Sequence, residues 1–204
     1  MNFKNSTKLA LTSLAFAGLL FAGKANAQEK KGLASGSDSQ GFRIGIGVEP
    51  GIPTGDRIRP YSHFALGGNL RAQYDLKGPV SLMLTAGYTN FFGRDYTSSA
   101  TIGGTTVTST TKAPDYGLIP VKAGIKIFPA HNFYFSGEAG VGFETNNNYE
   151  NAGNKSAKLI LAPGLGFAES YTGLDIGLRY ENYSGGNSGT FGQVALRVAY
   201  GFGN

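Results

Sequence analysis

The sequence predicts an all-β protein, a single eight-stranded antiparallel up-and-down barrel that follows a cleavable signal peptide. From residue 41 onward, apolar residues alternate with small or charged residues in segments of about ten, which is the length and the period of barrel strands. Short and long connections alternate between these segments, as they do in barrels of this kind. Glycine makes up 32 of the 204 residues, where an average usage of about 7% would give about 14.

The N-terminal segment carries the features of a secretory leader. Lys4 and Lys8 precede an apolar stretch at 9–22, and Ala25-Asn26-Ala27 fits the small-x-small rule for cleavage before Gln28. The chain has no Cys, which excludes disulfides, thiolate catalysis and thiolate metal sites. The predicted domains are a signal peptide at 1–27, a disordered lead-in at 28–40 and the barrel at 41–204.

The first four expected strands each present two unlike faces. In the first strand, Phe42 and Ile44 share one face, while Arg43 and Gly45 share the other. The same alternation recurs three times before residue 128, although the second and third strands are separated only by Lys77-Gly78-Pro79. The expected strands of this half are 42–49, 64–76, 80–88 and 119–127.

The second half repeats the pattern. In the seventh strand, for example, Leu174 and Ile176 oppose Asp175 and Gly177. The expected strands are 133–144, 159–168, 174–181 and 193–202. The expected short turns are 77–79, 129–132 and 169–173, and the expected loops are 50–63, 89–115, 145–156 and 184–190. Because the strand number is even, both termini and the lead-in should lie on one side of the barrel, the periplasmic side.

The composition of the second face predicts a barrel that spans a membrane. A face turned to bulk water is usually rich in Lys, Glu and Thr, but this face consists mainly of Gly, Ala and Ser with a few charges, which suits a narrow lumen filled by its own side chains. The apolar face carries no charge in any expected strand, as a lipid-facing band requires.

The inward charges balance, with six positive and six negative side chains, and charges in a confined lumen need partners. The alternative is that some of these charges lie beyond the membrane and only meet water, and Glu49 and Glu144 are the first candidates for it. The sequence therefore predicts a charge network that plugs the lumen. Its expected members are Arg43, Arg71, Asp75, Lys122, Lys126, Glu138, Asp175, Arg179, Glu181 and Arg197.

Aromatic residues and prolines add two further expectations. Aromatic side chains gather at both ends of the strands, as two interfacial girdles would. The turn-side girdle should contain Tyr74, Phe128, Phe133, Phe167, Tyr200 and Phe202, and the loop-side girdle Phe64, Tyr88, Phe143, Tyr180 and Phe191. Pro120 and Pro163 lie inside expected strands, where each removes a ladder donor, so we expect a bulge or a local break at each position.

Taken together, these features resemble the small eight-stranded outer-membrane β-barrel proteins of Gram-negative-type envelopes, also described as porin-like. The resemblance rests on Ala25-Asn26-Ala27 before Gln28, on the segment 119–124 and on the final strand, and it covers about 41–204. It implies an outer-membrane location, contact with outer-membrane lipid and insertion by the outer-membrane assembly machinery. Family members usually end on an aromatic residue that this machinery reads; the matching residue here is Phe202, which Gly203 and Asn204 follow.

The sequence leaves three functions open. The first is a monomeric, non-enzymatic envelope protein with a plugged lumen, which acts structurally or binds an extracellular partner through the Thr- and Ser-rich loop 89–115. The second is a small porin-like channel for ions or small solutes. The third is an outer-leaflet lipid-modifying enzyme built on His63 with Ser62, although adjacent strand residues point to opposite faces.

Two classes of ligand are not expected. No metal-ligand spacing and no phosphate-binding motif is present, and we predict neither a cofactor nor a catalytic residue. The net charge of +5 includes Lys4, Lys8 and Lys24 of the leader, so the basic balance does not indicate a nucleic-acid partner.

Overall fold

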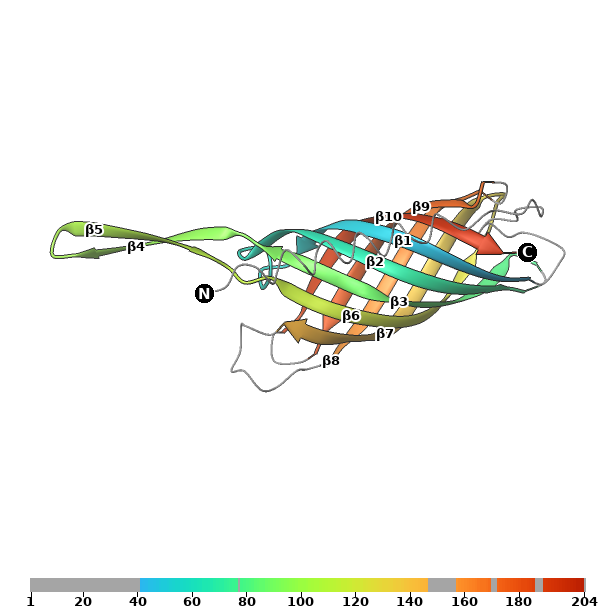
Figure 1. Cartoon of the computed structure of the whole chain (residues 1–204), viewed down its shortest axis with the longest axis horizontal. Helices are drawn as coiled ribbons and strands as arrows, with labels where there is room; N and C mark the ends of the chain where they lie inside the picture. The colour runs from blue at the N-terminus through green and yellow to red at the C-terminus, as the bar shows by residue number, and fades with distance from the viewer. Residues whose placement is uncertain (1–40, 77, 147–156, 170–171, 186–188, 204) are drawn as a thin grey trace, which may run out of the picture.

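Figure 1 shows the computed structural model of the chain, which describes residues 41–76, 78–146, 157–169, 172–185 and 189–203. The predicted signal peptide at 1–27 and the predicted lead-in at 28–40 lie outside these described residues. Within the described residues, no helix is long and apolar enough to cross a membrane.

The described residues form ten strands, eight of which close into one antiparallel barrel. The barrel strands are β1 (Gly41–Thr54), β2 (Ser62–Asp75), β3 (Val80–Gly93), β6 (Tyr116–Ile127), β7 (Phe133–Asn146), β8 (Ala157–Ala168), β9 (Leu174–Ser184) and β10 (Phe191–Gly203). Their order around the barrel is β1-β10-β9-β8-β7-β6-β3-β2, so each strand pairs with its sequence neighbour in the barrel and β1 closes on β10. This is the predicted up-and-down architecture.

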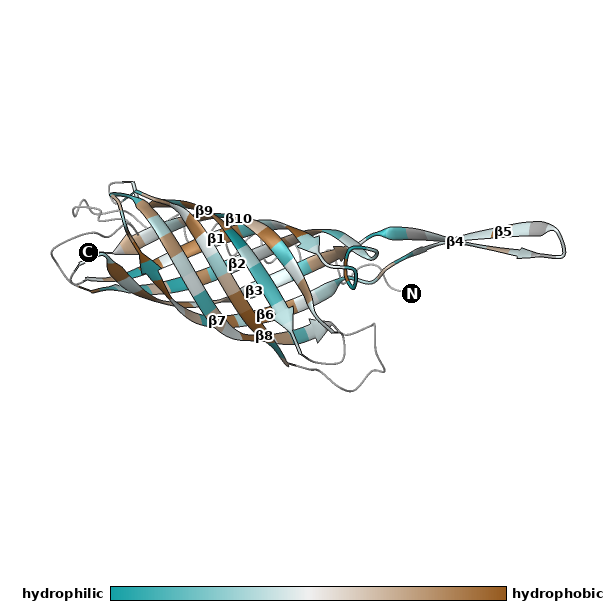
Figure 2. Ribbon diagram, turned by 180° about the vertical axis from the view of Figure 1, so that it is seen from behind, coloured by the Kyte–Doolittle hydropathy of each residue, from teal (hydrophilic) through white to brown (hydrophobic). Residues whose placement is uncertain are grey.

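The barrel is polar inside and apolar outside. All thirteen Lys, Arg, Asp and Glu side chains of the eight described barrel strands are buried, while large apolar side chains from every one of these strands are exposed. In β1, for example, Arg43 is 3% exposed and its neighbour Phe42 is 57% exposed. Figure 2 shows the resulting alternation of hydrophobic and hydrophilic residues along the ribbons. The two faces of the strands thus have the orientation that the sequence predicted.

The long loop expected at 89–115 is mostly regular structure, and that prediction is wrong in form. Strand β3 continues to Gly93, and the chain then forms a separate antiparallel hairpin of β4 (Asp95–Ile102) and β5 (Thr105–Lys112). Gly103 and Gly104 make its two-residue turn with φ of 60° and 84°, the left-handed conformations that a type I′ turn needs. The hairpin extends from one end of the barrel, roughly along its long axis (Figure 1).

The first expected loop is also shorter than predicted. Strand β1 runs through Pro50 to Thr54 and β2 begins at Ser62, so the connection is a tight segment of seven residues rather than 50–63. Within it, the Ser62 N–H donates to Ile58 O at 2.8 Å and the Tyr61 N–H donates to the same oxygen at 2.9 Å. These bonds satisfy the backbone where the alternating pattern stops.

The prolines do not bend their strands through bulges, contrary to one part of the expectation. Pro120 pairs with Gly142 on β7 and Pro163 pairs with Gly137 on β7, and β6 and β8 continue through them. Each proline instead leaves two residue pairs open in the ladder on its other side, with the register unchanged. The pairs that flank these gaps are Ala86↔Val121 with Thr89↔Leu118, and Leu161↔Asn182 with Gly164↔Arg179.

Pro50 in β1, which the sequence placed in a loop, produces a gap of the same kind between Val48↔Val198 and Gly51↔Ala195. The physical reason is shared by all three prolines. A proline lacks a single N–H, which in a sheet would face only one neighbouring strand, so the loss is confined to one ladder.

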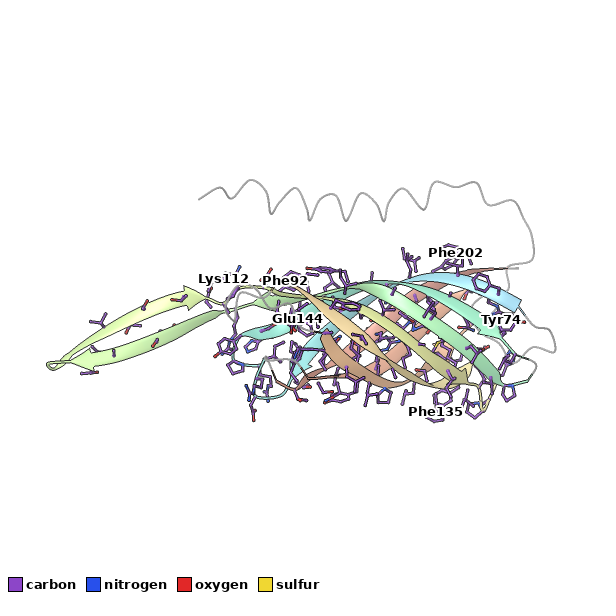
Figure 3. The ribbon with its side chains drawn as sticks, turned by 90° about the horizontal axis from the view of Figure 1, so that it is seen from below. Tyr74, Phe92, Lys112, Phe135, Glu144 and Phe202 are labelled. Carbon is purple, nitrogen blue, oxygen red and sulfur yellow. The ribbon has the colours of Figure 1, made fainter. Side chains whose placement is uncertain are left out.

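Most of the expected girdle aromatics lie outside, but two do not. Tyr74 and Phe202 of the expected girdle lie on the outer surface in the half of the barrel away from the hairpin, and Phe135, which was not among the expected residues, lies there too (Figure 3). Phe128 and Phe191, by contrast, are each only 5% exposed and point inward. Both stand at strand ends, where the period-two pattern gives no reliable guide to the side chain's direction.

Candidate functional site

The lumen is filled by a central network of nine charged side chains. Four cations surround Glu138: its Oε1 accepts from Arg179 Nη2 at 2.6 Å and from Arg71 Nη2 at 3.3 Å, and Lys122 and Arg197 each have a nitrogen 4.0 Å away. The full network consists of Glu49, Arg71, Lys122, Lys126, Glu138, Asp175, Arg179, Glu181 and Arg197.

Asp175 is the second centre of this network, nearer the turn end of the barrel. Its Oδ2 lies 2.5 Å from Lys126 Nζ and 3.3 Å from Arg71 Nη1, and its Oδ1 accepts from the Tyr134 hydroxyl at 2.6 Å. Lys126 also stands over the Tyr134 ring, with its nitrogen 3.9 Å from the ring centroid. With Arg197 Nη2 at 3.8 Å, this one carboxylate therefore joins three cations and a phenol from four other strands.

Tyr134 fits because the next two strands, β8 and β9, carry glycine at the positions that its hydroxyl reaches. A Cβ atom at Gly166 or at Gly177 would lie 2.5 Å or 2.6 Å from the Tyr134 hydroxyl oxygen. The absence of side chains there makes room for a phenol within a narrow barrel. Part of the high glycine content is thus the complement of the large lumen side chains.

The central network continues to the loop end through Glu181. Its carboxylate bonds to Lys122 and to the Tyr183 hydroxyl, and it accepts from Gln193 Nε2 at 2.6 Å. Arg179, which also bonds to Glu138, lies 3.3 Å from Glu181 and 3.0 Å from Glu49. No charge in this layer is left without an opposite charge close by.

Two smaller groups of charges close the network at its ends. At the turn end, Arg43 Nε lies 2.9 Å from Asp75 Oδ2, and Asp75 also accepts from Gln73 and Ser81 at 2.7 Å. At the loop end, Lys158 Nζ lies 3.9 Å from Glu144. Lys158 also donates to the carbonyl oxygens of Gly185 and Gly189, at 2.7 Å and 2.8 Å, and so ties the connection between β9 and β10 to the barrel.

An aromatic cap covers the network on the loop side. Phe91, Tyr116, Tyr183 and Phe191 pack ring against ring, with centroid distances of 5.0–5.9 Å. All four are buried, and Ile58 from the first connection lies in the same cluster. The lumen is therefore occupied by ion pairs in the middle and by aromatic rings at the hairpin end.

The structure places the ten predicted lumen residues inside the barrel and buries all of them. The alternative that Glu49 and Glu144 meet water does not hold, since both are 3% exposed and ion-paired. Lys158 was missed, because the sixth strand was expected to start one residue later. Its alternation with Leu159, Ile160 and Leu161 is the signal that could have identified it as an inward residue.

Ser62 and His63 do not form a catalytic pair. Ser62 is buried and its hydroxyl donates to Phe64 O at 3.1 Å, whereas His63 is exposed and its ring contacts the Arg94 guanidinium. Adjacent strand residues point to opposite faces, as expected. Among the residues that the structure describes, no group of three or more His, Asp and Glu side chains could hold a metal ion.

The second candidate site is the hairpin of β4 and β5. Its base is held by Arg94, whose Nε donates to Pro60 O at 2.7 Å and whose N–H donates to Tyr61 O at 2.8 Å. Asp115 accepts from the Gly93 N–H at 2.9 Å on the other side of the base. The only strand pairing of β4 and β5 among the described residues is with each other, so each has one unpaired edge.

Comparison with solved structures supports the fold. The chain is similar to the outer-membrane protein Ail of Yersinia pestis in a phospholipid bilayer nanodisc, at 17% identity and a TM-score of 0.50, over 80% of this chain and 100% of that chain. Two crystal structures of Ail, the attachment invasion locus protein of Yersinia pestis, match over 80% of this chain and 97% of theirs. One is of Ail alone, at 16% identity and a TM-score of 0.48, and the other is of its complex with the heparin analogue sucrose octasulfate, at 17% and 0.46.

No protein-family model and no curated protein matches the sequence. The exposed apolar belt and the buried charges nevertheless define an integral β-barrel of the outer-membrane type, with the fold that Ail has. A soluble protein does not expose an apolar surface that runs around all its strands, because water would oppose it.

Proposed function

We propose that the chain is a non-enzymatic, monomeric outer-membrane protein whose lumen does not conduct and whose hairpin is its outward binding element. Both termini would then lie in the periplasm, with the signal peptide removed and the last strand, including Phe202, read by the assembly machinery. The observation that carries the proposal is the filled lumen: nine linked charges below an aromatic cap leave the interior occupied along its length.

The small-pore alternative is disfavoured by the same observation. An eight-stranded barrel has an interior just wide enough for its own side chains. Here Arg71, Lys122 and Lys126 cross it and are each fully paired within it. Ions would have to displace buried salt bridges, which are costly to break singly.

Planar-bilayer recordings test the proposal. The full mature protein should give no steady conductance steps at moderate voltage, and stable single-channel steps would overturn the plugged lumen. Replacing two cap residues, Tyr183→Ala with Phe191→Ala, should raise the frequency of transient openings. The matched control, Tyr74→Ala with Phe135→Ala, removes two aromatic rings from the outer surface and should leave the recording silent.

The enzyme alternative has a separate test. Lipid A from cells that express the protein is compared with lipid A from cells that express His63→Ala. We expect identical profiles, since the structure assigns His63 to a contact with Arg94 at the rim. A product that depends on His63 would show that the chain is an enzyme.

A further inference from the structure

The hairpin offers two strand edges that lack the usual protection against pairing. Residues 96–111 contain no charged residue and no proline, and charges stand only at the base, on Asp95 and Lys112. Natural proteins normally guard exposed edges with charges, prolines, bulges or short strands. Each strand here is eight residues long and pairs with its partner without a register shift. An unguarded edge of this length is a template for a further strand.

The turn fixes which backbone groups face outward. In a two-residue hairpin, the residues that flank the turn exchange both hydrogen bonds, and bonded and non-bonded pairs then alternate. The flanking pair is Ile102↔Thr105. The outward N–H and C=O groups of β4 therefore belong to residues 95, 97, 99 and 101, and those of β5 to 106, 108, 110 and 112.

Three of the four cross-strand pairs at these positions join two hydroxyl side chains. Across the hairpin, hydroxyl oxygens meet at 3.2 Å for Thr97 and Thr110, at 3.2 Å for Ser99 and Thr108, and at 3.1 Å for Thr101 and Thr106. The two strands are also alike in composition, since Thr and Ser fill four of the eight positions of β4 and six of the eight of β5. A β4 edge thus matches the edge of another β4 or β5 in side-chain chemistry.

When the β4 edges of two copies pair about a two-fold axis, no side chain stands opposite one of the same charge. If the strands run antiparallel about Ser98, Thr97 of one copy faces Ser99 of the other, and Asp95 faces Thr101. The outward backbone groups then meet as hydrogen-bonded pairs, and no two like charges stand opposite one another. The corresponding pairing of two β5 edges places Lys112 opposite Thr106.

Strand direction decides where the second copy must be. Hairpins of two barrels in one membrane point the same way, so their β4 edges run parallel and their barrels hold them further apart than the ~4.8 Å between paired strands. Hairpins from two facing membranes point in opposite directions, which gives the antiparallel arrangement. An eight-residue strand adds about 27 Å of reach, at ~3.4 Å per residue, so the tips can overlap.

From these observations we propose that the hairpin is a homotypic adhesion element, which joins two membranes by edge-to-edge pairing with the hairpin of a second copy of this chain. The proposal rests on the proposed outward role of the hairpin. One contact between two isolated strands is weak, but many copies on each surface act together, and such multivalent contacts exceed the single affinity by orders of magnitude.

The experiment uses full-length mature protein in liposomes, with clustering followed by turbidity and light scattering. Wild-type proteoliposomes should cluster, at a rate that rises with protein density. The double variant Ser99→Pro/Thr108→Pro removes one outward donor from each edge, and it should lower the rate about tenfold or more, since the effect is multiplied over many contacts. Heat-modifiable migration on gels checks that its barrel has folded.

Two further variants separate edge pairing from loss of the hairpin. The matched control Ser99→Ala/Thr108→Ala keeps the outward N–H groups, and it should cluster within about threefold of wild type, because main-chain bonds supply most of the affinity in strand addition. Ser99→Lys keeps the backbone but places two cations near each other in the pair. Its clustering should fall at low salt and recover at high salt, which an unfolded hairpin would not do.

The outcomes are distinguishable from those of the conductance test. Wild-type liposomes that stay dispersed at high protein density, or proline variants that cluster like wild type, would overturn the homotypic proposal while leaving the plugged lumen intact. Clustering that needs an added foreign protein would also overturn it and would assign the edge to a heterologous strand. In a mixture of labelled liposomes, clusters should contain wild-type vesicles and exclude those with the double proline variant.

Discussion

Removal of the Glu138 carboxylate is the most direct test of the lumen network. Its side chain is fully buried and serves four cations, two at hydrogen-bonding distance and two at 4.0 Å. In Glu138→Ala the guanidinium groups of Arg71 and Arg179 lose a shared acceptor in a medium without bulk water. Removing one partner of a buried ion pair costs about 3–5 kcal/mol, and we expect a loss in this range.

That loss is a large part of the total, since native proteins are stable by about 5–15 kcal/mol. Equilibrium unfolding in urea, with the folded fraction read from heat-modifiable migration, measures it. With an m value of about 2 kcal/mol/M, the midpoint should fall by about 1.5–2.5 M while m stays constant. Glu138→Gln retains the side-chain volume, so a similar loss would assign the effect to charge rather than to a cavity.

The control is Asp95→Asn, which changes one exposed carboxylate at the base of the hairpin. Surface substitutions of this kind usually alter stability by less than about 0.5 kcal/mol. If Glu138→Ala and Glu138→Gln both lose less than about 1 kcal/mol, the network does not hold the barrel together, and the reasoning is refuted.

Three further substitutions test other parts of the fold. Tyr134→Phe keeps the ring between the facing glycines but removes the bond to Asp175, and should lower the free energy of unfolding by about 1–3 kcal/mol in the same urea assay; no change would mean that the hydroxyl is not needed. Gly140→Val places a Cβ about where the Val121 carbonyl oxygen lies, 2.0 Å away, so we expect no heat-modifiable band after refolding, whereas Gly137→Ala, with open space, should fold. Phe202→Ser should reduce the amount of protein assembled in cells while in vitro refolding stays near normal; equal amounts in cells would refute a signal at this residue.

Most of the barrel was predictable because lipid and lumen impose opposite demands on alternate residues. Because the lipid-facing side of a strand must be free of charge, Arg43 has to point into the lumen and its neighbour Phe42 toward the lipid. The same holds for Asp175 and its neighbour Ile176. The ten lumen residues could be chosen for the same reason. The sequence could not reveal which charges pair, since Arg71 and Glu138 are 67 residues apart and meet only when the barrel closes.

The ends of the strands were harder to predict. The sequence predicts a loop at 95–112 because the Thr and Ser residues there lack the contrast between faces on which the other assignments rest, and the described side chains of the hairpin are exposed. Gly103-Gly104 between two Thr-rich runs was the available signal for a two-residue turn. The prediction of Phe191 in the outer girdle fails for a related reason. Phe191 belongs to the aromatic cap at the loop end of the barrel, where an aromatic side chain can pack inside the lumen as well as at the membrane interface.

The closing seam of the barrel joins its first and last strands, and several inward positions there carry glycine or alanine. Gly45, Gly47 and Gly51 of β1 face Gly201, Ala199 and Ala195 of β10 across it. Seven of the nine linked charges are carried by β2, β6, β7 and β9, so most of the polar interior can assemble in a curved, still open sheet. The final closure then adds Arg43, Glu49 and Arg197 to an interior in which the other linked charges can already be paired. Closure in the membrane therefore carries only three of the thirteen lumen charges of the described strands on the two strands that meet last.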